Sequence, residues 1–235
     1  MPLPIYLALD ELGFEEALEL ARAVKNRVAG FKIHNLYDQY GRIVVEQLHK
    51  AGVESVFVDL KIHDIPNTAR LRALALKEAG ADIITVHASG GIEMMFEAAK
   101  AGVQTLGITI PTSINEEECN LIYGGPTKAK VLLLARWAKL AGLPGLVCSP
   151  KEVGLLSKQC ELRGMQFFVP GTRSADKGKD DQARVDTPAN AIKAGATYLV
   201  VGRQVTQAKD PTSALDQLEQ EINQTWKEQA QKEAP

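Results

Sequence analysis

Short apolar runs alternate with longer amphipathic segments along most of this chain, and that alternation limits its possible folds more than any other feature. Several runs are rich in β-branched residues and poor in charge, as expected for parallel strands buried on both faces. About eight runs can be counted, the number of strands in a (β/α)₈ barrel. They are Ile5–Leu9, Ala29–Ile33, Ser55–Leu60, Asp82–His87, Thr105–Ile110, Gly145–Ser149, Gln166–Val169 and Thr197–Val201.

A repeated Ala-Gly pair closes the helical segment before several of these runs. Glycine adopts the left-handed conformation that commonly ends a helix, so each pair predicts a helix end followed directly by a strand. The repetition indicates one strand–helix unit used many times, not two unlike domains. The pairs are Ala51-Gly52, Ala79-Gly80, Ala101-Gly102, Ala141-Gly142 and Ala194-Gly195.

The length of 235 residues suits one barrel domain, and no Pro/Ser-rich linker interrupts the chain. The main alternative fold, an open doubly wound sheet, needs a GxGxxG turn after its first strand, and the sequence has none there. We therefore predict an α/β fold, a single-domain (β/α)₈ TIM barrel over residues 1–225. A polar C-terminal tail is expected over residues 226–235.

Charge and cysteine content restrict the partners and the compartment. The net charge of −2 gives no reason to expect nucleic acid or an acidic membrane surface, so any anion site must be local. The N-terminal segment lacks the features of a signal peptide, and no apolar stretch approaches the ~20 residues that span a bilayer. Three cysteines without CxxC spacing predict reduced thiols and a cytoplasmic protein: Cys119, Cys148 and Cys160.

Charged residues gather where the predicted strands end, which is where barrel enzymes place their chemistry. Asp10 follows the first run, Lys32 lies in the second, and Asp59 and Lys61 end the third. Residues two apart on a strand point the same way, so Asp59 and Lys61 should face the barrel mouth together, with Lys32 beside them. Alternating charges keep each other ionised, and a lysine held between carboxylates is a proton donor. A purely structural salt-bridge network is the alternative interpretation.

Glycines and arginines follow the last two runs, at the place where barrels commonly bind phosphate. Gly171 and Arg173 end the seventh run, and Gly202 and Arg203 end the eighth. Glycine lets backbone N–H groups approach an anion, and arginine offers a fork of donors to phosphate oxygens. The polar stretch Ser174–Arg184 is expected to be a mobile loop that closes over the ligand, or else an ordinary solvated loop.

The histidines do not predict a metal site. His34, His63 and His87 follow apolar runs, but the nearby lysines would oppose a cation, so we expect hydrogen-bonding or packing roles. His49 lies in a helical segment and is expected to be plain surface. The chain also lacks HExxH, paired CxxC and GxxxxGK[ST] motifs. We therefore predict neither a metal nor an organic cofactor.

The segment DLKIHDIPNT at Asp59–Thr68, together with Asp10, Lys32, PGTR at 170–173 and GR at 202–203, resembles the orotidine 5′-monophosphate decarboxylase family. The resemblance extends from Asp10 to about Pro211. Its Asp-x-Lys-x-x-Asp core is shared by a wider superfamily of phosphate-binding barrels. The IPNT extension and the loop from Arg173 to Gln182 narrow the resemblance to the orotidine family.

The resemblance implies a cofactor-free enzyme that converts orotidine monophosphate to uridine monophosphate in de novo pyrimidine biosynthesis. Lys61 would protonate C6, with Lys32 and Asp59 holding the ribose and the charge network. Asp64, with Thr68, would enter the site of a partner subunit, which implies a homodimer with shared active sites. The other substrate-binding residues implied are Asp10 for the ribose, Thr112 for the pyrimidine, and Arg173, Gln182 and Arg203 for the phosphate, next to Gly202.

The sequence departs from the usual family pattern at three places, which concern the shape of the pocket. His34 stands where members often have glycine, and Pro111 replaces the leucine of a Leu-Thr-Ser sequence. The usual PGIRP-like sequence after the seventh run reads PGTRS, which places Thr172 and Ser174 there.

Two other functions compete with this interpretation. A sugar-phosphate decarboxylase, such as one acting on 3-keto-gulonate 6-phosphate, would stabilise an enediolate with Mg²⁺, so sensitivity to a chelator would separate it. A non-catalytic barrel that only binds a phosphate ligand would not need Lys61 between two carboxylates.

Overall fold

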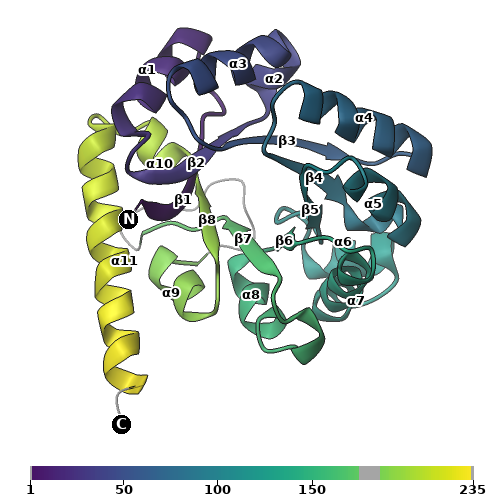
Figure 1. The fold of residues 1–235 in the computed structure, drawn as a ribbon. Helices are drawn as coiled ribbons and strands as arrows, with labels where there is room; N and C mark the ends of the chain where they lie inside the picture. Colours follow the sequence, from purple (N-terminus) through teal and green to yellow (C-terminus); the bar gives the residue numbers. More distant parts are fainter. Residues whose placement is uncertain (1, 175–185, 234–235) are drawn as a thin grey trace.

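Eight parallel strands close into a barrel in the computed structural model, in sequence order from β1 to β8 and back to β1 (Figure 1). The structure describes residues 2–174 and 186–233. This closed order confirms the predicted single-domain barrel and excludes the open doubly wound sheet. The strands are β1 (Leu3–Ala8), β2 (Val28–Ile33), β3 (Val56–Ile62), β4 (Ile83–His87), β5 (Gln104–Ile108), β6 (Gly145–Val147), β7 (Gln166–Pro170) and β8 (Tyr198–Val201).

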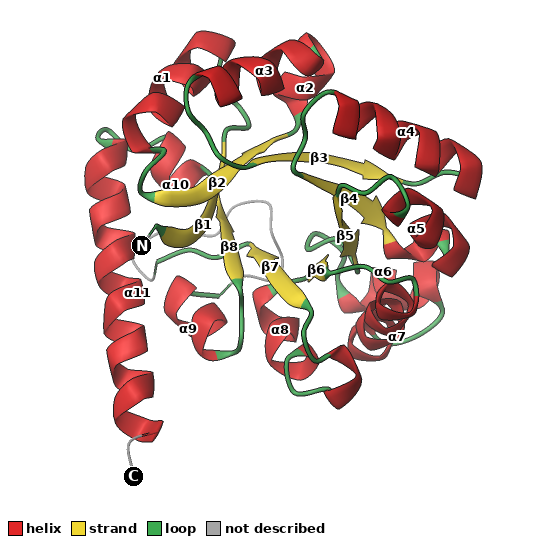
Figure 2. Ribbon diagram, in the orientation of Figure 1, coloured by secondary structure: helices red, strands yellow, loops and turns green. Residues whose placement is uncertain are grey.

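Helices surround the strands on the outside of the barrel (Figure 2). The α-helices are α1 (Phe14–Val24), α2 (Asn35–Tyr40), α3 (Arg42–Lys50), α4 (Pro66–Glu78), α5 (Ile92–Ala99), α6 (Glu116–Tyr123), α7 (Thr127–Leu140), α8 (Pro150–Leu156), α9 (Pro188–Lys193), α10 (Arg203–Thr206) and α11 (Pro211–Glu233). Two short 3₁₀ helices, η1 (Ala88–Gly90) and η2 (Cys160–Leu162), complete the described elements.

The Ala-Gly pairs end helices as predicted. All five glycines have positive φ, a conformation that costs glycine little and other residues more. The φ values are 88° at Gly52, 91° at Gly80, 73° at Gly102, 78° at Gly142 and 107° at Gly195. Each glycine turns the chain from the end of a helix toward the next strand, so the repeated pair sets the spacing of the strand–helix units.

A cluster of large side chains fills the inside of the barrel below the strand ends. The Tyr6 ring lies 5.4 Å from the Phe168 ring and 5.9 Å from the Phe57 ring, measured between centroids. Ile83 and Leu106 complete much of this inner cluster. Because successive inward positions on a strand are two residues apart, the next inward residues above this floor belong to the strand ends. The polar residues predicted for the site occur there.

Helix α11 packs against α9, α10 and α1 on the outside of the barrel and ends near the C-terminus marked in Figure 1. It continues past residue 225, where the sequence analysis sets the boundary between barrel and tail; that division stays a prediction. No described helix is both long enough and apolar enough to cross a membrane.

His49 is not the plain surface residue that its helical position predicted, and that prediction was wrong. Its Nδ1 lies 2.9 Å from the Val53 carbonyl oxygen and its Nε2 lies 2.9 Å from the Gly80 carbonyl oxygen. The Asp82 carboxylate is 3.5 Å from Nε2. The ring therefore joins the end of α3 to the backbone that leads into β3 and β4, a tertiary contact that helical periodicity does not reveal.

Candidate active site

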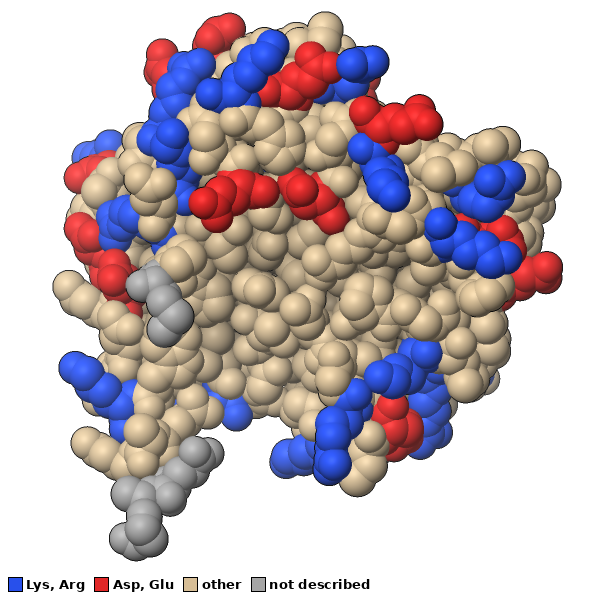
Figure 3. All heavy atoms as spheres, in the orientation of Figure 1, with Lys and Arg blue, Asp and Glu red and all other residues tan. Residues whose placement is uncertain are grey.

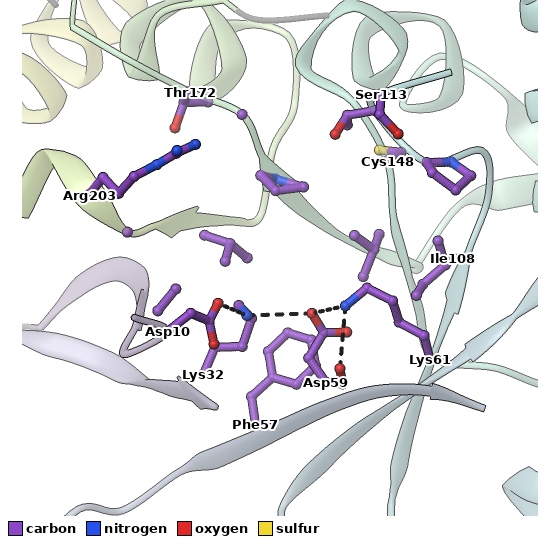
Figure 4. Close-up of a pocket in the computed structure, with 18 of the residues that line it drawn as sticks. Asp10, Lys32, Phe57, Asp59, Lys61, Ile108, Ser113, Cys148, Thr172 and Arg203 are labelled. Carbon is purple, nitrogen blue, oxygen red and sulfur yellow. Dashed lines mark hydrogen bonds and ion pairs between the residues drawn. The ribbon is translucent and has the colours of Figure 1, made fainter. Parts of the chain in front are cut away.

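A cavity of about 470 Å³ opens at the C-terminal ends of the strands, above the aromatic floor, and Phe57 forms part of its wall (Figure 4). Strands β1, β2, β3, β5, β7 and β8, or the residues that follow them, contribute most of the polar side chains. The cavity brings together most of the predicted site residues. Those in its lining are Asp10, Lys32, Asp59, Lys61, Thr112, Arg173, Gly202 and Arg203.

Four charged side chains form a continuous network along one wall of this cavity (Figure 4). Lys32 Nζ donates to Asp10 Oδ2 at 2.5 Å and lies 3.5 Å from Asp59 Oδ2. Lys61 Nζ donates to the same Asp59 oxygen at 2.8 Å. The alternation of acid, base, acid and base confirms the arrangement predicted from the strand ends. Lys61, the last member, is also the more exposed of the two lysines.

Thr85, which was not among the predicted site residues, binds the other carboxylate oxygen of Asp59. The Thr85 hydroxyl donates to Asp59 Oδ1 at 2.7 Å and accepts a hydrogen bond from the Lys61 backbone N–H at 2.9 Å. Thr85 is fully buried on β4. A threonine inside an apolar run carries no motif, but it stands two residues before His87 and therefore on the same inward face. The two-residue period of a strand could therefore have identified Thr85 as a residue of the site.

The environment keeps Asp59 ionised. Burial would raise the pKa of this carboxyl, but the charges of Lys32 and Lys61 and the hydrogen bonds from Lys61 and Thr85 outweigh burial, so the pKa lies below its ordinary value. The ionised carboxylate lies between the ammonium groups of Lys32 and Lys61, at 3.5 Å and 2.8 Å. The network can therefore present Lys61 as a fixed positive charge with a proton to donate.

Lys61 arrives at this position through an irregular backbone and not through a regular strand. Its φ is 51°, one of two positive values at described non-glycine residues. The pairing of β3 with β4 also shifts, from Val58 opposite Ile84 to Ile62 opposite Val86. Between these two pairs, three residues of β3 oppose one of β4, which is a bulge. Bulges re-aim side chains near active sites, and the left-handed conformation of a non-glycine residue costs on the order of 1–2 kcal/mol.

Two buried polar atoms of residues that line the cavity have no hydrogen-bond partner among the described residues. Asp10 Oδ1 is buried and unbonded, although Oδ2 of the same carboxylate binds Lys32. Thr172 is 4% exposed, and its hydroxyl is likewise unbonded. Buried polar groups without partners cost about 1–3 kcal/mol each. Both atoms are therefore suited to hydrogen bonds with a polar ligand.

Arginines and glycines occupy the side of the cavity opposite the charge network. Figure 4 shows Arg203 and Thr172 across the view from Asp10 and Lys32. Gly171 has a φ of 77°, so a glycine is favoured at the turn that leads from β7 to Arg173. This side of the cavity offers the cationic donors that the sequence predicted for an anion.

The surface charge is mixed on the face shown in Figure 3. Basic and acidic side chains are interspersed over the surrounding helices, and the centre of this face is largely uncharged. No extended basic area appears in this view. This face therefore offers no general attraction for an anion, in line with the net charge of −2.

His87 lines the cavity, whereas His34 and His63 do not belong to its lining. The His63 and His87 rings lie 5.4 Å apart, measured between centroids. Burial, His63 and Lys61 together lower the pKa of His87, against a smaller opposing effect of Asp59.

Within residues 2–174 and 186–233, no three His, Cys, Asp or Glu side chains come together as a candidate metal site. Among the residues that depart from the family pattern, Pro111 and Thr172 line the cavity, whereas His34 and Ser174 do not.

Asp64 and Thr68 are not brought to the cavity of this chain. Asp64 is exposed, and its Oδ1 accepts a hydrogen bond from the Ile65 backbone N–H at 2.7 Å. Thr68 is half-buried in the first turns of α4. Gln182, predicted for the phosphate, and most of Ser174–Arg184 lie outside the described residues.

Comparison with known proteins agrees with this geometry. The model of the orotidine 5′-phosphate decarboxylase / HUMPS family matches residues 4–218. The chain is 41% identical to an orotidine 5′-phosphate decarboxylase of Anaeromyxobacter dehalogenans, over 89% of this chain and 94% of that one. It is also 41% identical to the enzyme of that name from Sphingopyxis alaskensis, over 93% and 99%. A crystal structure of orotidine 5′-phosphate decarboxylase from Lactobacillus acidophilus matches with a TM-score of 0.77 and 33% identity, covering 94% and 99%.

Proposed function

Because the chain belongs to the orotidine 5′-phosphate decarboxylase / HUMPS family, we propose that it decarboxylates orotidine monophosphate to uridine monophosphate without a cofactor. Its relatives are orotidine 5′-phosphate decarboxylases, so this chain is a carboxy-lyase, and the reaction is a step of pyrimidine biosynthesis. The observation that carries the proposal is the network from Asp10 through Lys32 and Asp59 to Lys61. An ammonium group held at the end of such a network suits a reaction that develops negative charge on carbon.

In the proposed mechanism, Lys61 stabilises the negative charge that develops on C6 and then protonates this carbon. The bond from C6 to the carboxylate breaks, its electron pair stays on C6, and CO₂ leaves. No carbonyl group is placed to delocalise the pair well, so the positive charge of Lys61 stabilises it electrostatically. The ammonium then gives its proton to C6, which forms uridine monophosphate, and the neutral amine regains a proton from solvent.

Asp59 contributes in a second, smaller way. Its carboxylate is buried and ionised, and the substrate carboxylate would lie close to it. The repulsion between the two is relieved when CO₂ leaves, which lowers the barrier by raising the energy of the bound substrate. We rank this effect below the electrostatic role of Lys61.

The remaining lining residues bind the substrate in this proposal. Asp10 uses its unbonded Oδ1 to accept a hydrogen bond from a ribose hydroxyl, next to Lys32. Thr112 contacts the pyrimidine. Arg173 and Arg203, beside Gly202, bind the phosphate, with Gln182 from the segment outside the described residues. Binding energy from the phosphate, remote from C6, then helps to organise the reacting end.

We also propose a homodimer whose sites are shared. Asp64 and Thr68 lie outside the cavity of their own chain, and helices α4 and α5, which pack against each other in this region, carry exposed apolar side chains. Ile65 is 66% exposed and Phe96 is 48% exposed, and Ile92 and Leu71 are also exposed. Burying such a patch against a second copy would remove apolar area from water and bring Asp64 toward the partner's cavity.

The three free thiols support the expected cytoplasmic location.

The test measures CO₂ release from two substrates with purified protein. We expect release from orotidine monophosphate in excess EDTA, and none from 3-keto-gulonate 6-phosphate with or without Mg²⁺. Two ammonium groups already lie within 3.5 Å of Asp59 Oδ2, which would repel a divalent cation there. Release of CO₂ from the sugar phosphate alone, in the presence of Mg²⁺, would indicate a sugar-phosphate decarboxylase instead. Binding of uridine monophosphate without any CO₂ release would indicate a non-catalytic barrel.

A further inference from the structure

The residues that directly follow the two proposed phosphate arginines are hydrogen-bonded to each other. Ser174 follows Arg173, and Gln204 follows Arg203. The Ser174 backbone N–H donates to Gln204 Oε1 at 3.2 Å, and Gln204 Nε2 donates to Ser174 Oγ at 2.6 Å. Because both ends of the amide bind the same residue, the pair fixes the orientation as well as the separation of the two segments.

A carboxylate on the outer helix α11 anchors this pair. Ser174 Oγ donates to Glu221 Oε2 at 2.8 Å. The other oxygen, Glu221 Oε1, accepts a hydrogen bond from the Ala189 backbone N–H at 3.1 Å, in the first turn of α9. The end of β7, the start of α10, α9 and α11 are therefore joined through one set of polar contacts.

Gln204 is buried without belonging to the cavity. It is 9% exposed and absent from the cavity lining, as is Ser174. A buried amide needs hydrogen-bond partners, and here both of its polar atoms have one in Ser174. The side chain is also neutral, so it does not compete with an anion for the two arginines.

The link depends on the backbone N–H and the hydroxyl of Ser174. Ser174 stands where the PGIRP-like sequence has proline, which has neither an N–H nor a hydroxyl to offer. Both hydrogen bonds to Gln204, and the bond to Glu221, use atoms that proline lacks at this position.

We infer that Gln204 is a positioning residue for the anion site: through Ser174 it holds the Arg173 and Arg203 segments in the separation that one phosphate requires. The inference rests on the proposed function for the identity of the substrate, but the anion site itself can be tested with inorganic phosphate. Preorganised donors avoid the cost of ordering on binding, so loosening them weakens binding of the phosphate. The charge network lies across the cavity, so chemistry at C6 in the saturated enzyme should change little.

The test compares Gln204→Leu with a matched control, Gln104→Leu. Gln104 also forms a side-chain hydrogen bond between neighbouring segments, to Gln166 Oε1 at 2.8 Å, but at the start of β5 and away from the cavity. Thermal unfolding is measured with and without inorganic phosphate, and KM and kcat are measured with orotidine monophosphate. The nucleoside orotidine, which lacks the phosphate, serves as a second substrate.

We expect phosphate to raise the unfolding midpoint of the wild type and of Gln104→Leu, and much less that of Gln204→Leu. KM for orotidine monophosphate should rise about tenfold in Gln204→Leu, with kcat within about twofold and kcat/KM for orotidine unchanged. Ser174→Ala, which keeps the backbone N–H, should give a smaller change in the same direction and replaces Gln204→Leu if that variant does not fold.

Equal phosphate stabilisation of Gln204→Leu and wild type would overturn the inference, as would equal losses on orotidine and its phosphate. Absence of phosphate stabilisation in the wild type would overturn it too. Failure of the proposed function would give a different result. Wild type would then not turn over orotidine monophosphate, but inorganic phosphate would still raise the unfolding midpoint of wild type more than that of Gln204→Leu.

Discussion

Lys61 Nζ lies 2.8 Å from Asp59 Oδ2 although the two residues are not on a regular stretch of strand, since Lys61 has a φ of 51°. The bulge between Val58 and Ile62 aims the lysine into the cavity. Thr85 fixes this geometry from the neighbouring strand, because its hydroxyl binds both the Asp59 carboxylate and the Lys61 N–H. The position of the proposed proton donor therefore depends on β4 as well as on β3.

Thr85→Val should lower kcat by about tenfold, because a hydrogen bond to a charged group contributes about 1.5–3 kcal/mol and holds Asp59 in place. Steady-state kinetics with orotidine monophosphate measures this effect. Thr105→Val is the control, since Thr105 is also buried but its hydroxyl binds the Val103 carbonyl oxygen and not Asp59. Equal kcat in wild type and Thr85→Val would show that Asp59 and Lys61 need no support from β4.

His87 should make the folded protein more stable as the pH rises through the range just below 6.5, its ordinary pKa. Its pKa is lowered in the fold by burial, His63 and Lys61, so the unfolded chain binds more protons than the folded one in that range. His87→Gln should remove this part of the pH dependence in denaturant unfolding. His34→Gln is the control, because His34 is exposed and outside the cavity. An unchanged slope in His87→Gln would contradict the expectation.

Thr172→Val should weaken phosphate binding without destabilising the protein. The hydroxyl is buried and has no partner among the described residues, so its removal costs the fold nothing, while a bound ligand loses a donor. We expect KM for orotidine monophosphate to rise about fivefold, equivalent to about 1 kcal/mol. Thr225→Val, which loses a hydroxyl bonded to the Glu221 carbonyl oxygen, should instead leave KM unchanged. Loss of stability in Thr172→Val would indicate a structural hydroxyl.

Mixing two inactive variants should restore activity if the sites are shared. Lys61→Ala and Asp64→Ala are each expected to be nearly inactive, but a mixed dimer contains one site with both residues intact. Random exchange of subunits should therefore recover about a quarter of the wild-type activity, since half of the dimers are mixed and each has one good site of two. The assay follows turnover after mixing, with the mass of the species measured in parallel. Monomers, or mixed dimers without activity, would refute the shared site.

Sequence periodicity was sufficient for the fold and for most of the cavity wall. Inward positions at strand ends follow from the two-residue period of a strand, which is why Asp10, Lys32 and Asp59 could be placed together from the sequence. The same period also predicted Lys61 beside them, although it is a bulge that brings its side chain there. The glycine of each Ala-Gly pair at a helix end is a local preference and was equally predictable. Both signals depend only on neighbours along the chain.

Features that depend on contacts between distant segments were not predictable in the same way. Thr85 carries no motif, and the bulge that aims Lys61 depends on the pairing of β3 with β4. The contacts of His49 and of Gln204 join segments that are 31 and 30 residues apart, respectively. The proposed role of Asp64 depends on a second chain, and Gln182 lies in a segment outside the described residues.

The most direct test of the central claim measures Lys61→Ala in two ways. Turnover of orotidine monophosphate is followed by its ultraviolet change in excess EDTA, and binding of uridine monophosphate is measured on the same preparation. We predict that wild type converts the substrate, and that Lys61→Ala loses at least about 10⁴-fold in kcat while it still binds the product, because one group supplies both charge stabilisation and the proton. Normal turnover by Lys61→Ala would contradict the assignment of Lys61 as the proton donor.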